Sequence, residues 1–255
     1  ESSAVIYANS ILDARTNREG GISALMAAIA GRTYYSGMHL DEFRKPTEVF
    51  IYDGEVDSIT IASLLGIYIG LHTQGIPYIT ARTIAKRDIV LRNLLASIAT
   101  TSSSPMAFIE GVTREKVDER YLSSLSRHFI TENDLRKYGG ECDAHVLLLG
   151  CPHVATESEL NELLTETYNS IKSGKLKVDR VIVTTAPTVE LRSPETRNLV
   201  NKLRSADVEV LILRGCAVVT NIKMLNIDSV ATPHGKAAYY LEKLWGVKSC
   251  ISGAA

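Results

Sequence analysis

The sequence lacks an excess of charge of either sign. Its 255 residues include 28 Lys and Arg against 29 Asp and Glu, which gives a formal net charge of −1. This balance provides no general attraction to polyanions, so nucleic acid and anionic membrane surfaces are disfavoured as partners. No run approaches the ~20 apolar residues of a membrane-spanning helix, and no basic segment followed by an apolar stretch marks a secretory signal. The sequence therefore predicts a cytoplasmic globular protein without a membrane partner.

Cysteine, glycine and proline are also scarce. The 4 Cys, 17 Gly and 7 Pro are too few for a disulfide-stapled or low-complexity chain. The cysteines stand at positions 142, 151, 216 and 250 without a C-x-x-C pair, which disfavours a self-contained zinc site. The six histidines lack the H-E-x-x-H spacing of zinc hydrolases. We therefore expect reduced thiols throughout the chain.

Short β-branched runs alternate with helical patterns through most of the sequence. Near-continuous apolar runs at 146–149 and 210–213 are typical of strands in a parallel sheet that is covered on both faces. The alternation predicts an α/β fold with mostly parallel sheets, in two halves, 1–140 and 141–255. Strands are expected at 3–8, 48–52, 77–80, 106–110, 144–149, 180–184 and 208–213, and helices at 21–30, 59–73, 88–99, 157–172, 194–205 and 236–245.

Two of these helices have recognisable starts. Thr156 followed by Glu159 is a capping-box pattern, in which the hydroxyl and the carboxylate satisfy exposed amides of the first turn. Ser193 followed by Pro194 places an N-cap residue before a proline at the first helical position.

Two predicted strands end in the same dipeptide. The runs 146–149 and 210–213 lead into Gly150–Cys151 and, after Arg214, into Gly215–Cys216. A glycine permits a sharp turn, and ligands of open α/β sheets bind at the carboxyl ends of the strands. Two thiols at this edge can converge on one metal centre, and His153 adds a polar group to the first turn.

Simple packing is the alternative for these thiols, because free cysteine is among the most buried residues. The repeated Gly-Cys context makes ligation and packing about equally probable for Cys151 and Cys216 on the residues alone. Cys142 and Cys250 lack this context and are expected to be packing or surface thiols.

Two further turns carry groups that suit an anion. Residues 14–21 place Arg15, Asn17 and Arg18 just before a predicted helix, where guanidinium groups and the helix dipole favour carboxylate or phosphate. Lys236 opens another predicted helix, where the dipole disfavours a cation unless an anion lies nearby. A polar connecting loop and a surface lysine are the alternative interpretations.

Taken together, these motifs resemble the large subunit of the aconitase X family. The resemblance extends over essentially the whole chain, with the motifs in the same order, and it rests on residues 8–21, 150–153, 214–216 and 235–240. Members are dehydratases related to aconitase that act on cis-3-hydroxyproline in bacteria and on mevalonate 5-phosphate in archaea. Residues 15–21 are most similar to the archaeal branch.

The resemblance implies roles for individual residues. Cys151 and Cys216 match two of three cysteines that hold an iron–sulfur cluster, expected to be of the 4Fe–4S type with one open iron. Lys236 matches a substrate-binding lysine, and the third cysteine is expected upstream of Glu1. Two departures from the family pattern are Asp13, where glycine is usual, and 232–235, which replaces an Asn-Ser-Ala-type approach to the lysine.

The function implied is a hydro-lyase that converts mevalonate 5-phosphate to its anhydro product in isoprenoid synthesis, with cis-3-hydroxy-L-proline as the alternative substrate. Arg15, Asn17 and Arg18 are candidates to bind the substrate anion, and His153 is a candidate to support the ligands. The general base is expected on a small subunit, so this chain alone should be inactive. A non-catalytic anion-binding module and a structural subunit are the rival interpretations.

Overall fold

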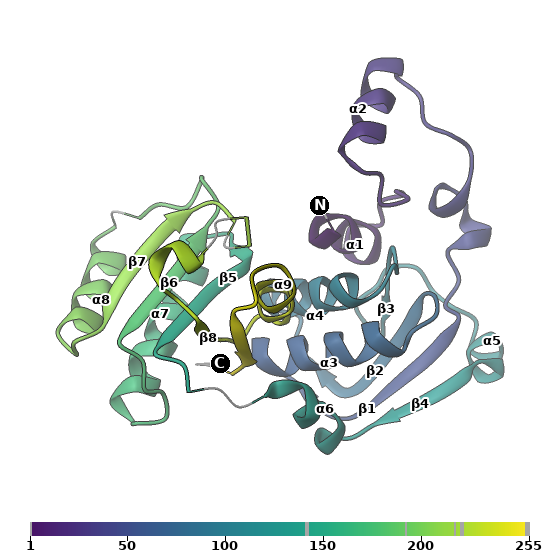
Figure 1. Ribbon diagram of the computed structural model, residues 1–255. Helices are drawn as coiled ribbons and strands as arrows, with labels where there is room; N and C mark the ends of the chain where they lie inside the picture. Colours follow the sequence, from purple (N-terminus) through teal and green to yellow (C-terminus); the bar gives the residue numbers. More distant parts are fainter. Residues whose placement is uncertain (1, 141–142, 192, 217, 220–221, 253–255) are drawn as a thin grey trace. The chain divides into compact units, whose positions relative to one another are not determined.

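The structure is a computed structural model that describes residues 2–140, 143–191, 193–216, 218–219 and 222–252. The chain divides into two compact units (Figure 1). The first contains residues 1–57 and 65–135, and the second contains residues 58–64 and 136–255. Each unit is built on its own sheet.

The first unit contains a four-stranded, all-parallel sheet in the order β3-β2-β1-β4. Its strands are β1 (Glu48–Val56), β2 (Pro77–Ile84), β3 (Phe108–Ile109) and β4 (Ser126–Ile130). The helices and 3₁₀ turns around it are α1 (Ser2–Ile11), α2 (Gly21–Ala30), η1 (Gly37–His39), η2 (Asp41–Phe43), α4 (Asp88–Thr101) and α5 (Glu119–Ser124). Helices α3 (Ile59–His72) and α6 (Glu132–Gly139) include residues of both units.

Helices α3 and α4 pack closely because two glycines of α3 face α4. A Cβ added to Gly66 would lie 2.4 Å from the carbonyl oxygen of Leu94, and one added to Gly70 would lie 2.7 Å from that of Ile98. Most residues of both helices are buried, as the nearly uniform apolar character of 59–73 predicted.

Helix α1 corrects one expectation, since residues 3–8 were predicted to form a strand. The buried positions Ile6, Asn9 and Ser10 follow a helical spacing, and α1 packs against α4 (Figure 1). Two of the three are polar, so a search for periodic apolar residues misses the face. Asn9 and Ser10 are satisfied there, since Asn9 bonds Thr16 and Pro105 and the hydroxyl of Ser10 accepts from an amide.

The second unit contains a five-stranded, all-parallel sheet in the order β7-β6-β5-β8-β9. Its strands are β5 (Val146–Val154), β6 (Arg180–Thr185), β7 (Glu209–Arg214), β8 (Ser229–Thr232) and β9 (Lys248–Ile251). Its other elements are α7 (Glu157–Lys172), α8 (Pro194–Arg204), η3 (Ile222–Leu225) and α9 (Gly235–Trp245). The α/β class with parallel sheets, predicted from the alternating pattern, is confirmed.

Both predicted helix starts are present in this unit. The Thr156 hydroxyl accepts from the amide of Glu159 at 3.2 Å, and the Glu159 carboxylate accepts from the amide of Ala155 at 3.0 Å. The Ser193 hydroxyl accepts from the amide of Thr196 at 3.1 Å, with a proline at the first helical position. These side chains satisfy amides that the helix itself leaves without a partner.

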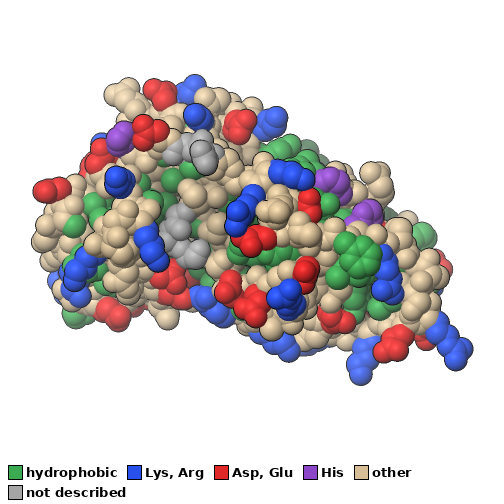
Figure 2. All heavy atoms as spheres, turned by 90° about the horizontal axis from the view of Figure 1, so that it is seen from below, with side chains coloured by type: hydrophobic (Ala, Val, Ile, Leu, Met, Phe, Trp, Pro, Cys, Tyr) green, Lys and Arg blue, Asp and Glu red, His purple; other side chains and the backbone are tan. Residues whose placement is uncertain are grey.

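Charge is distributed over the surface as the balanced composition predicts. Figure 2 shows basic and acidic side chains interspersed over the face that it presents. Within the described residues, every helix is too short or too polar to be a candidate membrane span. Helix α2 is apolar but has no buried residue, and its large side chains are 53% to 80% exposed: Ile22, Leu25, Met26 and Ile29.

Candidate functional site

The Gly150–Cys151 dipeptide lies inside β5, where the pairing with β6 shifts register between Leu149 and Val154. This segment, called the Cys151 turn, is fixed by two hydrogen bonds to the backbone of Gly150. The hydroxyl of Thr184 on β6 donates to the Gly150 carbonyl oxygen at 2.7 Å. The Gly150 amide donates to Nε2 of His234 at 2.9 Å. Both groups come from neighbouring elements, so the turn that precedes Cys151 is held from two sides.

Gly150 must be a glycine at this position. Its φ is +105°, which side chains rarely adopt, and an added Cβ would lie 2.1 Å from the backbone oxygen of Thr184. The close approach of the Gly150 and Thr184 backbones explains why a glycine precedes Cys151.

Cys151 is a buried free thiol, with 6% of its surface exposed. It belongs to the hydrophobic cluster under α9 that includes Leu148, Ala237 and Leu241. Burial raises the pKa of Cys151 to about 12, the Lys236 charge lowers it, and the Cys216 thiol raises it. These electrostatic effects require Cys151, Cys216 and Lys236 to lie in one region of the unit.

The turn after β7 is more open than the Cys151 turn. Gly215 is exposed with φ +126°, and no atom lies within 4 Å of a Cβ added to it. Cys216 is a free thiol and is partly exposed. The ring of His153 bonds the Gly215 carbonyl oxygen at 2.7 Å through Nε2, which ties this turn to the one that carries Cys151.

The two thiols were expected on neighbouring strands, and the sheet order corrects this detail. Strand β6 lies between β5 and β7, so the strands that carry the two Gly-Cys dipeptides are the first and third of three adjacent parallel strands. Gly215–Cys216 directly follows β7 as predicted, whereas Gly150–Cys151 was predicted to follow its strand and lies inside β5, which continues to Val154.

Lys236 stands in the first turn of α9 and is half-buried. Its Nζ lies 5.9 Å from the ring centroid of Tyr240, one helical turn away. The aromatic face partly offsets the unfavourable placement of a cation at a helix start. With its electrostatic effect on Cys151, this places the lysine beside the thiols and not on a remote surface.

His234 is a residue of the site that sequence reasoning missed. It is 1% exposed, occupies the N-cap position of α9 and accepts a hydrogen bond from the amide of Gly150. The only sequence signal was its place in 232–235, the segment that departs from the expected family pattern. Periodicity could not identify it, because its partner is 84 positions away.

The Arg-rich loop of the first unit is organised around the Glu19 carboxylate. Burial raises the pKa of Glu19, but hydrogen bonds from the Thr16 hydroxyl, its own amide, His39 and the Asn17 amide lower it to about 2. Asn17 also donates through its side chain to the Ser36 carbonyl oxygen at 3.1 Å. The loop is therefore held by its own polar groups.

The two candidate arginines of this loop have protein partners. Arg15 pairs with Asp41 at 2.9 Å and lies 3.7 Å from Glu115. Arg18 donates to carbonyl oxygens at the carboxyl end of α4: Ala99, Ser102 and Ser104. Such contacts stabilise a helix end and also hold the loop in place.

Asp13 adopts a φ of +58°, a conformation that glycine enters at least cost. This accounts for the expectation of glycine at the position. The buried guanidinium of Arg44, a residue that sequence reasoning also missed, donates to the carbonyl oxygens of Asn9 and Ala14 and pairs with Glu115.

The donors present suit part of a thiolate-ligated cluster. Cys151 and Cys216 are free thiols, and Cys151 is so buried that an uncompensated thiolate is strongly disfavoured. A bound iron centre would supply the positive charge that such a thiolate needs. In the part of the chain that the structure describes, no group of three or more His, Cys, Asp or Glu can hold a metal ion. The fit therefore covers two ligand positions.

The remaining cysteines differ from expectation in one respect. Cys250 is 3% exposed and disulfide-bonded, so the expectation that all thiols are reduced is wrong. Cys142 lies outside the described residues.

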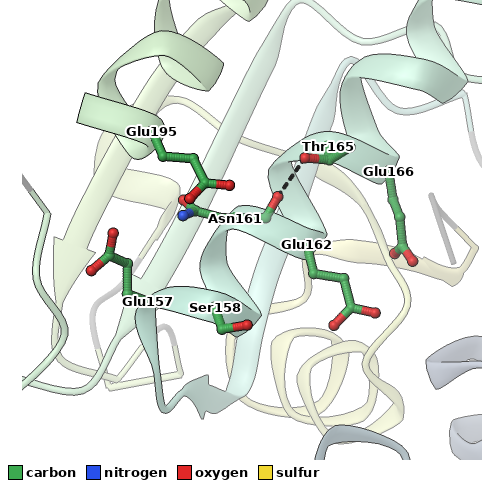
Figure 3. Close-up of a pocket in the computed structure, with 7 residues that line it drawn as sticks. All are labelled: Glu157, Ser158, Asn161, Glu162, Thr165, Glu166 and Glu195. Atoms are coloured by element: carbon green, nitrogen blue, oxygen red, sulfur yellow. Dashed lines mark hydrogen bonds between the residues drawn. The ribbon is translucent and has the colours of Figure 1, made fainter. Parts of the chain in front are cut away.

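A separate cavity of about 630 Å³ lies along α7 and α8 (Figure 3). Four carboxylates line it, from Glu157, Glu162, Glu166 and Glu195, together with Asn161, whose carbonyl oxygen accepts from the Thr165 hydroxyl at 2.7 Å. Negative charge on all sides disfavours a carboxylate or phosphate ligand. The cavity is therefore a poor substrate site for an anion.

Comparison with protein families assigns three successive parts of the chain. Residues 1–42 match the aconitase X first domain, 46–139 the second domain and 144–254 the third domain. The chain belongs to the aconitase X family.

Relatives and a solved structure agree with this assignment. The chain is 33% identical to the phosphomevalonate dehydratase large subunit of Thermococcus kodakarensis, over 94% of this chain and 61% of that one. It is 31% identical to the same subunit of Methanocaldococcus jannaschii, with the same coverage. The holo-form crystal structure of Thermococcus kodakaraensis aconitase X matches with a TM-score of 0.75 and 30% identity, over 98% of this chain and 64% of that chain.

A second kind of relative is cis-3-hydroxy-L-proline dehydratase, and that of Hypocrea jecorina is 26% identical over 96% of this chain and 43% of that protein. The chain is 38% identical over 122 residues to the cis-3-hydroxy-L-proline dehydratase of Pseudomonas aeruginosa, which is 46% of this chain and 21% of that protein. The chain spans about three fifths of the length of the phosphomevalonate dehydratase subunits that it matches.

Proposed function

We propose that this chain is the cluster-binding part of an iron–sulfur hydro-lyase that dehydrates a β-hydroxy acid. The observation that carries the proposal is that the His153 ring bonds the Gly215 carbonyl oxygen at 2.7 Å, which brings the segments of Cys151 and Cys216 together on one parallel sheet. Lys236 lowers the pKa of the Cys151 thiol, in agreement with a place near it. Two thiols and a cation in one place suit a metal centre that works on an anionic substrate.

The residues of this chain have two proposed roles in dehydration, which are to hold the cluster and to bind the substrate. Cys151 and Cys216 are two ligands of the cluster, and a third thiolate comes from elsewhere in the protein. The cluster, when bound, supplies the Lewis acid that the departing hydroxyl group needs. Lys236 binds a charged group of the substrate, and the apolar cluster around Cys151 keeps water from the thiol side.

The proton beside the substrate carboxylate requires a base. We assign this base to a small subunit, because the relatives are named large subunits. The chain therefore acts in a heterodimer. Arg15, Asn17 and Arg18 serve this site by shaping the loop, since their side chains already bond protein groups.

Mevalonate 5-phosphate is the substrate that we propose, because the phosphomevalonate dehydratase large subunits match 94% of this chain at 31% to 33% identity. A cis-3-hydroxy-L-proline dehydratase that matches 96% of this chain is 26% identical. Cis-3-hydroxy-L-proline is the second candidate, favoured by the higher identity over 122 residues. Assay of the complete enzyme with both compounds distinguishes the two.

The test of the cluster is anaerobic purification of the full-length protein with its partner subunit. Iron content and the visible absorption band should both fall in Cys151→Ser and Cys216→Ser, because a serine oxygen is a poor substitute for a thiolate. Cys250→Ser, outside both turns, should retain its iron. A colourless, iron-free wild-type complex that still binds phosphate would support a non-catalytic anion-binding subunit instead.

The test of Lys236 compares two ligands in the Lys236→Ala variant of the same complex. Affinity for mevalonate 5-phosphate should fall roughly 10- to 150-fold, the equivalent of ~1.5–3 kcal/mol for a charge-assisted hydrogen bond. Affinity for mevalonate without the phosphate should barely change. Equal losses would assign the lysine to the carboxylate, and no loss would remove it from the site.

A further inference from the structure

His234 links the two parts of the site that the proposed function uses. Its backbone amide donates to the Thr232 hydroxyl at 3.2 Å, and its carbonyl oxygen accepts from Ala238 in the first turn of α9. The residue is therefore fixed at the helix start, two positions before Lys236. Its ring reaches away from the helix to the Gly150 amide.

The direction of this hydrogen bond defines the state of the ring. A backbone amide only donates, so Nε2 of His234 accepts and carries no proton. Gly150 immediately precedes Cys151, and its amide is buried. Without the ring nitrogen this amide would lose its acceptor in an interior where such a loss is costly.

On β6, the hydroxyl of Thr184 donates a hydrogen bond to the Gly150 carbonyl oxygen. The carbonyl oxygen of Gly150 is thus bonded to β6, and the next residue, Cys151, carries the thiol. The bond to His234 fixes the other side of Gly150 to the helix that carries Lys236.

We propose that His234 is a positioning residue that holds the Cys151 turn against the start of α9, and so fixes Cys151 relative to Lys236. The inference rests on the proposed function for what these two residues do. The positioning itself is a property of the metal-free protein and can be measured there.

Two substitutions of similar polarity separate the hydrogen bond from simple packing. In His234→Gln the side-chain oxygen is as many bonds from Cβ as Nε2 of histidine, so it can accept from Gly150. In His234→Asn the oxygen is one bond shorter and cannot reach. His145→Asn, at a histidine whose side chain is 70% exposed, is the control for loss of an imidazole in the same unit.

Two measurements on metal-free, full-length protein report whether the Cys151 turn is held. Hydrogen exchange of the Gly150 amide should accelerate roughly 10- to 100-fold in His234→Asn, because its acceptor is lost. Alkylation of Cys151 should accelerate by a similar factor as the turn opens. His234→Gln should lie within about threefold of wild type in both, and exchange of amides in β6 should stay unchanged in every variant.

The proposal is overturned if His234→Asn leaves both rates unchanged, or if His234→Gln is as impaired as His234→Asn. Should His234→Asn fail to fold, the wild type decides: a measurable scalar coupling between the Gly150 amide nitrogen and Nε2 of His234 is required, and its absence rejects the bond. Iron content of the Cys151→Ser complex tests the proposed function separately, so either idea can fail alone.

Discussion

The two Gly-Cys turns have the same dipeptide and different surroundings. Within β5, Gly150 is buried, its peptide groups bond Thr184 and His234, and an added Cβ would strike backbone. At the end of β7, Gly215 is exposed and an added Cβ would meet open space. The first turn is fixed by packing, and the His153 ring ties the second to it through its bond to the Gly215 carbonyl oxygen.

This difference indicates a division of labour between the thiols. The Cys151 turn is held before any ligand is present, because the amide and the carbonyl oxygen of Gly150 both have protein partners. The Cys216 turn has more room, since Gly215 is exposed and no described atom lies within 4 Å of a Cβ added to it. A metal centre that bridges the two would thus meet one preformed ligand and one ligand with more room.

The largest effect should come from Gly150→Ala. The added Cβ meets the backbone of Thr184, and the residue must keep a positive φ, so overpacking and backbone strain together should cost about 2–6 kcal/mol. Urea unfolding measures this loss. Gly174→Ala, where φ is +73° and no atom lies within 4 Å, isolates the strain alone. If both variants lose the same free energy, the turn is not packed as described.

The next prediction is that Cys151 and Cys216 differ in their rates of alkylation. With a pKa raised to about 12 by burial, roughly one Cys151 thiol in ten thousand is ionised at pH 8, so alkylation of metal-free protein should be very slow. Cys216 is partly exposed and should react first. Because the pKa lies above the assay range, each unit of added pH should speed Cys151 labelling about tenfold up to pH ~11. Mass spectrometry of time points gives both rates; equal rates would contradict the contrast.

Gly215→Ala should cost less than Gly150→Ala. Space is available for the methyl group, so the loss is limited to the strain of a positive φ in a non-glycine residue, about 1–2 kcal/mol. Urea unfolding of this variant beside Gly174→Ala should give similar values. A loss as large as that of Gly150→Ala would mean that the β7 turn is also packed.

Much of this fold could be predicted from the sequence, because its strongest signals are local. Six helices were placed within about two residues at their starts, and Thr156 and Ser193 cap two of them as expected. The failures have physical causes. In α1 the buried face includes the polar residues Asn9 and Ser10, so the apolar residues alone do not show a helical period. Strands β4, β8 and β9 were missed because they are short or mostly exposed, and their stability depends on pairing with distant strands.

Some residues of the candidate site could likewise be predicted from the sequence, and others could not. The Gly-Cys dipeptides and Lys236 could be found because they belong to continuous motifs. His234 and Thr184 could not, because each acts through a partner more than thirty positions away. The difference between Gly150 and Gly215 is likewise a property of what packs around each glycine. The roles of the thiols, Lys236 and the Arg-rich loop stay predictions.

Thr184→Val should cost no more than Gly215→Ala, and it examines the Cys151 turn most selectively. Thr184 and Thr185 are adjacent on β6 and are 2% and 0% exposed. The Thr184 hydroxyl donates to Gly150 at 2.7 Å, whereas that of Thr185 lies 3.5 Å from the Leu213 carbonyl oxygen, too far for a strong hydrogen bond. Valine has the shape of threonine, so packing is retained in both variants. Thr184→Val should therefore lose about 1–2 kcal/mol in urea unfolding, since the Gly150 carbonyl stays buried without this donor, while Thr185→Val should change by less than ~0.5 kcal/mol. Cys151 alkylation should accelerate only in Thr184→Val, and equal behaviour of the two variants would show that the Thr184 bond does not hold the turn.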